Sequence, residues 1–184
     1  ARFSIAPAYY TGSEVTPEVT VTHSGKTLVK DRDFTVTYHN NIEPSSYYNS
    51  PWVGIDGIGN YQGYVTKSFT INRADISSCT VTLSDESLTY TGSSLRPTAT
   101  VKSGDKELTL NQDYYVSYRN NWDAGTASAI LTGTGNYTGS VTKDFTIKPL
   151  DISRYSASLS QYSYTSDGTE KCPDVTVTYG DKTL

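Results

Sequence analysis

The chain has 184 residues, of which 35 % are hydrophobic, and it carries a formal net charge of −4. Its charges are scattered along the chain, which excludes the concentrated basic surface typical of a nucleic-acid-binding protein. Its longest apolar runs, such as Ala129-Ile130-Leu131, fall far short of the roughly 20 residues that a membrane span requires. We therefore expect neither a nucleic-acid partner nor insertion into a membrane.

The residue types predict an all-β protein. Thr, Val and Tyr dominate the chain, which contains 16 Tyr, and branched or aromatic side chains pack well on a pleated surface. Apolar residues do not recur at the 3.6-residue period of a helix anywhere in the chain. The modest apolar content suits small sandwiches, in which each strand buries one face and leaves the other in water.

In chain order, the first 72 residues predict several short strands. Residues 18–22 alternate polar and apolar side chains, as a half-buried strand does. A turn at Ser24-Gly25-Lys26 follows, where Gly accepts a positive φ. Three further strands are expected, each with alternating apolar residues on one face. These residues are Phe34, Val36 and Tyr38 in the first strand, Val53 and Ile55 in the second, and Phe69 and Ile71 in the third. Short strands separated by frequent turns are typical of a sandwich or barrel.

The chain repeats itself. Tyr10-Thr11-Gly12-Ser13 returns as Tyr90-Thr91-Gly92-Ser93, a shift of 80 positions (90 − 10). Val65-Thr66-Lys67 returns as Val141-Thr142-Lys143, a shift of 76 (141 − 65). The difference places a four-residue insertion in the first copy between Asn41 and Gly57. A third copy begins, since residues 97–108 match residues 173–184, again at 76 (173 − 97).

These shifts define repeat 1 (residues 1–72), repeat 2 (residues 73–148) and repeat 3 (residues 149–184), the last being the first half of a unit. Repeat 1 also lacks its opening residues, since the shift of 80 aligns Ala1 with Val81. The junctions at residues 71–76 and 147–152 contain no Gly/Ser tract that would act as a loose coil. We expect tandem small antiparallel β-sandwiches arranged as a semi-rigid rod, the last of them truncated.

The recurring blocks also resemble a known family. Repeat 2 contains, in order, Tyr90-Thr91-Gly92, Asp113-Tyr114-Tyr115-Val116, Ala124-Gly125-Thr126-Ala127 and Gly133-Thr134-Gly135-Asn136-Tyr137. This order is similar to a tandem repeat of the immunoglobulin-like and mostly-β, Gly-rich modules in cell-surface and secreted proteins of Gram-positive bacteria. The resemblance implies an extracellular location, at the cell surface or cell wall, and a role as spacer or adhesin architecture without a known active site.

The candidate residues for catalysis are few. His23 aligns with Ser103 and His39 with Arg119, so neither position requires an imidazole in repeat 2. No spacing of Cys and His indicates zinc, and we expect no catalytic, cofactor-binding or metal-binding residue and hence no enzyme. The recurring Asp33 and Asp113 precede a strand, where a carboxylate accepts backbone N–H groups in a turn; a calcium ligand is the alternative.

Aromatic side chains are the one indication of binding. Tyr47, Tyr48 and Trp52 cluster in the loop that carries the insertion, and Trp122 lies in the corresponding loop of repeat 2. Such rings stack on sugars and anchor protein interfaces, so a glycan or a host surface protein is a candidate partner. The alternative is that Trp52 and one tyrosine fold back over the end of the sandwich.

Two expectations concern the cysteines and the half repeat. Cys79 and Cys172 occupy different positions in their repeats, and a rod would hold them too far apart for a disulfide. Residues 149–184 supply only two or three strands, which are marginal alone in water. This segment is expected to dock on residues 73–148 or, in the preferred alternative, to associate with the same segment of a second molecule.

Overall fold

The structure is a computed structural model in which residues 2–179 and 182–183 are described. Regular structure in these residues consists of β-strands and two short 3-10 turns, so the all-β prediction is confirmed. Repeat 1 forms β1 (Arg2–Ile5), β2 (Ala8–Tyr9), β3 (Val19–His23), β4 (Lys26–Thr27), β5 (Phe34–His39), β6 (Trp52–Gly57), β7 (Tyr64–Ser68) and β8 (Ile71–Asn72).

Repeat 2 begins with β9 (Ala74–Asp75) and the 3-10 turn η1 (Ile76–Ser78). Its further strands are β10 (Thr80–Leu83), β11 (Ser87–Thr89), β12 (Ala99–Ser103), β13 (Lys106–Glu107), β14 (Tyr114–Arg119), β15 (Gly125–Gly133), β16 (Tyr137–Thr138) and β17 (Ser140–Lys148). The described part of repeat 3 forms the 3-10 turn η2 (Ile152–Arg154), β18 (Ser156–Leu159), β19 (Val175–Tyr179) and β20 (Lys182–Thr183).

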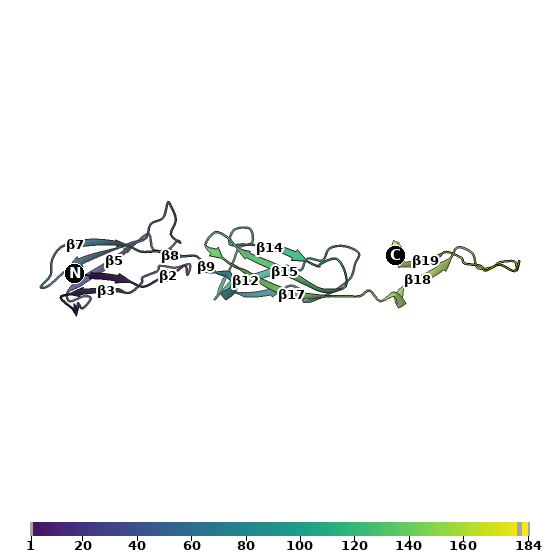
Figure 1. The fold of residues 1–184 in the computed structure, drawn as a ribbon, viewed down its shortest axis with the longest axis horizontal. Coiled ribbons are helices and arrows are strands. Elements are labelled where there is room, and N and C mark those ends of the chain that lie inside the picture. The colour runs from purple at the N-terminus through teal and green to yellow at the C-terminus, as the bar shows by residue number, and fades with distance from the viewer. Residues whose placement is uncertain (1, 180–181, 184) are drawn as a thin grey trace.

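The sheets of repeats 1 and 2 follow the same plan. Repeat 1 contains the antiparallel sheets β1-β3-β4 and β5-β6-β7, and repeat 2 contains β10-β12-β13 and β11-β17-β15-β14. A short parallel pairing recurs as well, between β2 and β8 in repeat 1 and between β11 and β17 in repeat 2. Figure 1 shows the repeats following one another along the long axis of the molecule, with β18 and β19 beyond repeat 2.

The two main sheets of repeat 1, like those of repeat 2, enclose an apolar core. In repeat 1, Val21 of β3 packs against Phe34 of β5 and against Val53 and Ile55 of β6. In repeat 2 the residues that correspond to Val21 and Ile55, Val101 and Leu131, are completely buried. The alternating side chains of facing sheets therefore build a sandwich-like layer in both repeats.

The insertion in repeat 1 interrupts a ladder that is continuous in repeat 2. There, Gly125 of β15 pairs with Ile147 of the long strand β17. In repeat 1, Ser45 of the inserted loop takes the place of Gly125 and bonds to Ile71, the counterpart of Ile147. The Ser45 N–H donates to the carbonyl oxygen of Ile71 at 2.9 Å, and Ser45 Oγ accepts the Ile71 N–H at 2.9 Å. One long strand is consequently divided into β7 and β8.

The alignment of Ala1 with Val81 is wrong by two positions. In repeat 1, Phe3 pairs with Val21, whereas in repeat 2 Val81 pairs with Val101, the counterpart of Val21. Phe3 is therefore the structural counterpart of Val81, and the segment between the first two strands is two residues shorter in repeat 1. Matching apolar types rather than identical residues define this strand, so the sequence blocks did not reveal its register.

The described residues of repeat 3 form the antiparallel sheet β18-β19-β20. This sheet pairs with no strand of residues 73–148 in the described part of the chain, and Leu159 and Val175 on it are exposed. Docking by strand pairing onto repeat 2 is thus absent from the described residues. Self-association through residues 149–184 stays a prediction.

Candidate functional site

The side chains of Tyr47 and Tyr48 form an exposed aromatic pair. Each is 94 % exposed, and their ring centroids lie 5.0 Å apart with the ring planes at 86°. Exposed rings of this kind present rigid apolar area to a partner at low entropic cost. The pair is the most prominent aromatic surface of repeat 1.

Polar contacts within the inserted loop hold this pair in place. Asn49 Nδ2 donates to the carbonyl oxygens of Glu43 at 2.8 Å and of Pro44 at 3.2 Å. The backbone N–H of Asn49 donates to Ser46 Oγ at 3.1 Å. Since Ser45 is also tied to β8, the loop is fixed at both sides of its tip.

Trp52 and Trp122 lie apart from the tyrosine pair. The sequence placed Trp52 in the loop, but in the structure it is the first residue of strand β6. Its ring stacks on His39, with ring centroids 3.9 Å apart and ring planes at 14°. Trp122 is 59 % exposed and lines a shallow pocket of repeat 2 together with Asn120 and Asp123. Of these four residues, Tyr47 and Tyr48 are in ring contact with each other, and Trp52 is in ring contact with His39.

A second cluster joins repeat 1 to repeat 2. The ring of Tyr10 packs edge-on against the ring of Tyr137, with centroids 5.7 Å apart. Lys106 Nζ donates to Tyr10 Oη at 3.4 Å, and Asn136 Nδ2 donates to Glu43 Oε2 at 2.7 Å. These five residues are named the junction cluster below.

Apolar residues from both repeats surround the junction cluster. Ala8 and Ile71 of repeat 1 belong to the same buried cluster as Ile76 and Val101 of repeat 2. Burial raises the pKa of Tyr137 above its ordinary value of 10.0. The hydrogen bond to Tyr10 raises the pKa of Lys106 above 10.5, so its ammonium is charged at neutral pH. The connection between the repeats is thus a packed interface rather than a flexible linker.

The recurring aspartates hold turns, as the sequence predicts. Asp33 Oδ2 accepts the Val29 N–H and Asp113 Oδ2 accepts the Thr109 N–H, each at 2.9 Å. Arg32 donates to Asp33, and this hydrogen bond lowers the pKa of the Asp33 carboxyl below 3.8.

In each of the recurring pairs Asn40-Asn41 and Asn120-Asn121, the first residue adopts a positive φ, 54° at Asn40 and 53° at Asn120. The second residue of each pair is buried and serves another purpose. Asn41 Nδ2 donates to the carbonyl oxygen of Val15 at 3.2 Å, and Asn121 Nδ2 donates to that of Leu95 at 2.8 Å. These side chains tie the loop before β6 or β15 to the segment that precedes β3 or β12.

Glycines at corresponding positions of repeats 1 and 2 form tight turns. Gly59 has a φ of 66°, and a Cβ built there would lie 2.9 Å from the Arg32 carbonyl oxygen. Gly135 repeats this arrangement against Gln112 in repeat 2. Both the positive φ and the close approach require glycine.

The described residues also bear on metal binding, membrane insertion and the two cysteines. In residues 2–179 and 182–183, no three or more His, Cys, Asp or Glu side chains gather in a way that could hold a metal ion. No helix in that part of the chain is long and apolar enough to cross a membrane. Cys79, which is half buried, and Cys172, which is exposed, are both free thiols.

The junction cluster was missed in the sequence, although both of its tyrosines stand in recurring motifs. Tyr10 belongs to Tyr-Thr-Gly and Tyr137 to Gly-Asn-Tyr. The recurrence of both motifs was the available signal, but it did not indicate that the motif of one repeat contacts the motif of the next. Comparisons of the chain with protein-family models, with curated proteins and with solved structures found no match.

Proposed function

We propose that this chain is a non-catalytic structural spacer, made of tandem immunoglobulin-like β-sandwich repeats, from a cell-surface or secreted protein of a Gram-positive bacterium. In this role the repeats extend a distal functional domain from the cell wall. The partners of each repeat are then its neighbours in the same chain. The proposal rests on the resemblance of the recurring motifs and on the junction between repeats.

The packed junction is the observation that carries the proposal. A spacer must keep its length under thermal motion, which a flexible linker between domains does not allow. Tyr10 is 8 % exposed and Tyr137 2 % exposed, and both belong to one apolar cluster that crosses from repeat 1 to repeat 2. Contacts of this kind favour one relative orientation of the two repeats.

Small-angle X-ray scattering of the full chain tests the proposal. A compact globular protein of this length has a radius of gyration of about 16 Å. A spacer predicts a clearly larger value and a cross-sectional profile typical of a rod, unchanged from low to moderate salt. A radius near the compact value, or the scattering profile of a flexible chain, would contradict the spacer function.

A second candidate function, adhesion to a glycan or a host surface protein, is favoured by the exposed Tyr47 and Tyr48 pair. Here the fixed loop would offer two rings to a sugar face or an apolar protein surface. A glycan array probed with the full chain and with a Tyr47→Ala/Tyr48→Ala variant tests this function. Binding that the variant loses supports adhesion, whereas binding of equal strength by both proteins argues against this site.

A further inference from the structure

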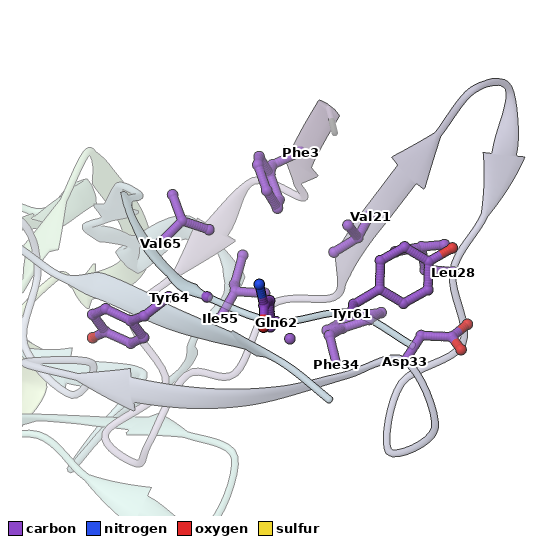
Figure 2. A pocket seen from close by; sticks show the side chains of 12 residues that line it. Phe3, Val21, Leu28, Asp33, Phe34, Ile55, Tyr61, Gln62, Tyr64 and Val65 are labelled. Carbon is purple, nitrogen blue, oxygen red and sulfur yellow. The ribbon is translucent and has the colours of Figure 1, made fainter. Parts of the chain in front are cut away.

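Repeat 1 contains an open cavity of about 220 Å³, lined in part by residues of β1, β3, β5, β6 and β7. Figure 2 shows Phe3, Val21 and Phe34, from strands β1, β3 and β5, among the side chains that surround it. Leu28, Tyr61 and Val65 line it as well. The lining is predominantly apolar.

In repeat 2 the corresponding residues enclose an isoleucine. Ile76 is completely buried and belongs to one cluster with Val101, Leu108 and Tyr114, the counterparts of Val21, Leu28 and Phe34. Ile76 comes from the segment at residues 73–78, Arg-Ala-Asp-Ile-Ser-Ser, which is called the junction segment below. This segment enters from the side of repeat 1 and fills the core of repeat 2.

The backbone of the junction segment is fixed as well. Its strand β9 pairs in parallel with β16, and the Ala74 N–H donates to the Asn136 carbonyl oxygen at 3.0 Å. Asp75 Oδ1 accepts the Ser77 N–H at 2.9 Å and so caps the turn η1. The docked segment therefore combines an apolar plug with specific backbone pairing.

The described residues of repeat 1 place no side chain at the position of Ile76. The register of β1 makes Arg2 the counterpart of Thr80, four residues after Ile76. Leu108 and Tyr137 are 4 % and 2 % exposed, whereas their counterparts Leu28 and Tyr61 in repeat 1 are only half buried. The cavity of repeat 1 thus has the walls of the isoleucine site with its interior uncovered.

We propose that the cavity of repeat 1 is a docking site for the junction segment of a second copy of this repeat. The isoleucine of the segment enters the cavity, and its backbone pairs with Tyr61 and Gln62. The tyrosine of the Tyr-Thr-Gly motif in that copy then packs on Tyr61 and Lys26, as Tyr10 packs on Tyr137 and Lys106. The inference rests on the proposed spacer function and adds to it the partner of this cavity.

A second segment of the same kind forms the same turn although its isoleucine is exposed. In residues 149–154, Asp151 Oδ1 accepts the Ser153 N–H at 3.0 Å and caps η2, as Asp75 caps η1. Ile152, the counterpart of Ile76, is nevertheless 60 % exposed. Because the turn is already formed, docking loses little conformational entropy.

The test attaches this segment to the full chain. A copy of residues 73–78 is fused directly before Ala1. This spacing is correct because the register of β1 makes Arg2 the counterpart of Thr80. A matched control fusion contains aspartate in place of the isoleucine. Hydrogen exchange measured by mass spectrometry then reports on residues 53–65. The isoleucine fusion should slow exchange there at least about tenfold relative to the aspartate fusion and raise the melting temperature by several degrees.

Two substitutions identify the cavity as the place of docking. Val65→Trp fills the cavity and should remove the protection that the isoleucine fusion gives. Val29→Trp adds the same ring at an exposed residue outside the lining and should retain the protection. Equal exchange in both fusions, or protection that survives Val65→Trp, would overturn the inference. Scattering from the unfused chain would still report the rod, so failure of this inference is distinguishable from failure of the spacer function.

Discussion

The ring of Tyr10 in repeat 1 meets the ring of Tyr137 in repeat 2 edge to face, with the two planes at 89°. Such an arrangement places the positive edge of one ring against the negative face of the other, which stabilises it beyond simple burial. Lys106 of repeat 2 donates a hydrogen bond to the hydroxyl of Tyr10. The orientation of one repeat against the next therefore depends on few side chains.

Replacing Tyr10 with alanine should weaken the junction strongly. Truncating a buried aromatic side chain costs on the order of 3 kcal/mol, and Tyr10 is 8 % exposed. Urea unfolding at neutral pH measures the loss. The matched control is Tyr90→Ala, since Tyr90 is the half-buried counterpart in repeat 2 and should cost clearly less. Equal losses for the two variants would contradict the importance of the junction.

Replacing Asp33 with asparagine should lower stability at neutral pH but not in strong acid. Arg32 lowers the pKa of Asp33 in the folded protein below 3.8. The carboxylate therefore contributes stability above pH 3.8, and this contribution is lost as the pH falls through the lower folded value. Urea unfolding of both proteins across the acid range measures the difference.

The control for this prediction is Asp113→Asn. Asp113 makes the same turn contact, but Gln112 stands where repeat 1 has Arg32. The pH dependence should therefore be stronger for the Asp33 variant. If the free energy of unfolding of Asp33→Asn stays below that of the unaltered protein by a constant amount into strong acid, the charge of this carboxylate does not contribute to stability.

The exposed tyrosine pair should be dispensable for folding. Tyr47→Ala combined with Tyr48→Ala should change the free energy of unfolding by no more than about 0.5 kcal/mol, since both rings are exposed. Trp52→Ala should cost about 1–2 kcal/mol because it removes the stacking on His39. Thermal unfolding separates the two cases, and a large loss in the tyrosine variant would assign those rings to the fold.

The two thiols should react at different rates. The thiolate is the reactive form, and burial raises the pKa of Cys79 above its ordinary value of 9.0. Cys172 is exposed. A time course of alkylation at pH 8, followed by mass spectrometry of the peptides, should show Cys172 modified first. Faster modification of Cys79, or the absence of free thiols, would contradict this.

The sequence predicted much of the local structure because the repeat supplies each motif twice. The all-β class is confirmed, as is the turn-forming role of Asp33 and Asp113. These features depend on neighbours within a few residues. A motif at a fixed spacing is sufficient to predict them.

Features that depend on distant pairing were not predictable in this way. The division of β7 from β8 follows from Ser45, which takes the place of a strand residue by bonding to Ile71 through its own N–H and its side-chain hydroxyl. The register of Phe3 and the packing of Tyr10 on Tyr137 likewise join segments far apart in sequence. Neither leaves a periodic pattern, so only the three-dimensional arrangement reveals them.

The distance distribution between spin labels on the two repeats tests the central claim, a stiff connection between them. Labels are placed by Lys67→Cys on β7 and Thr142→Cys on β17, both at exposed positions, with Cys79 and Cys172 replaced by serine. The packed junction predicts one narrow distance distribution, which Tyr10→Ala broadens and Tyr90→Ala leaves narrow. A broad distance distribution in the labelled protein with Tyr10 and Tyr90 unaltered would contradict a stiff connection between the repeats.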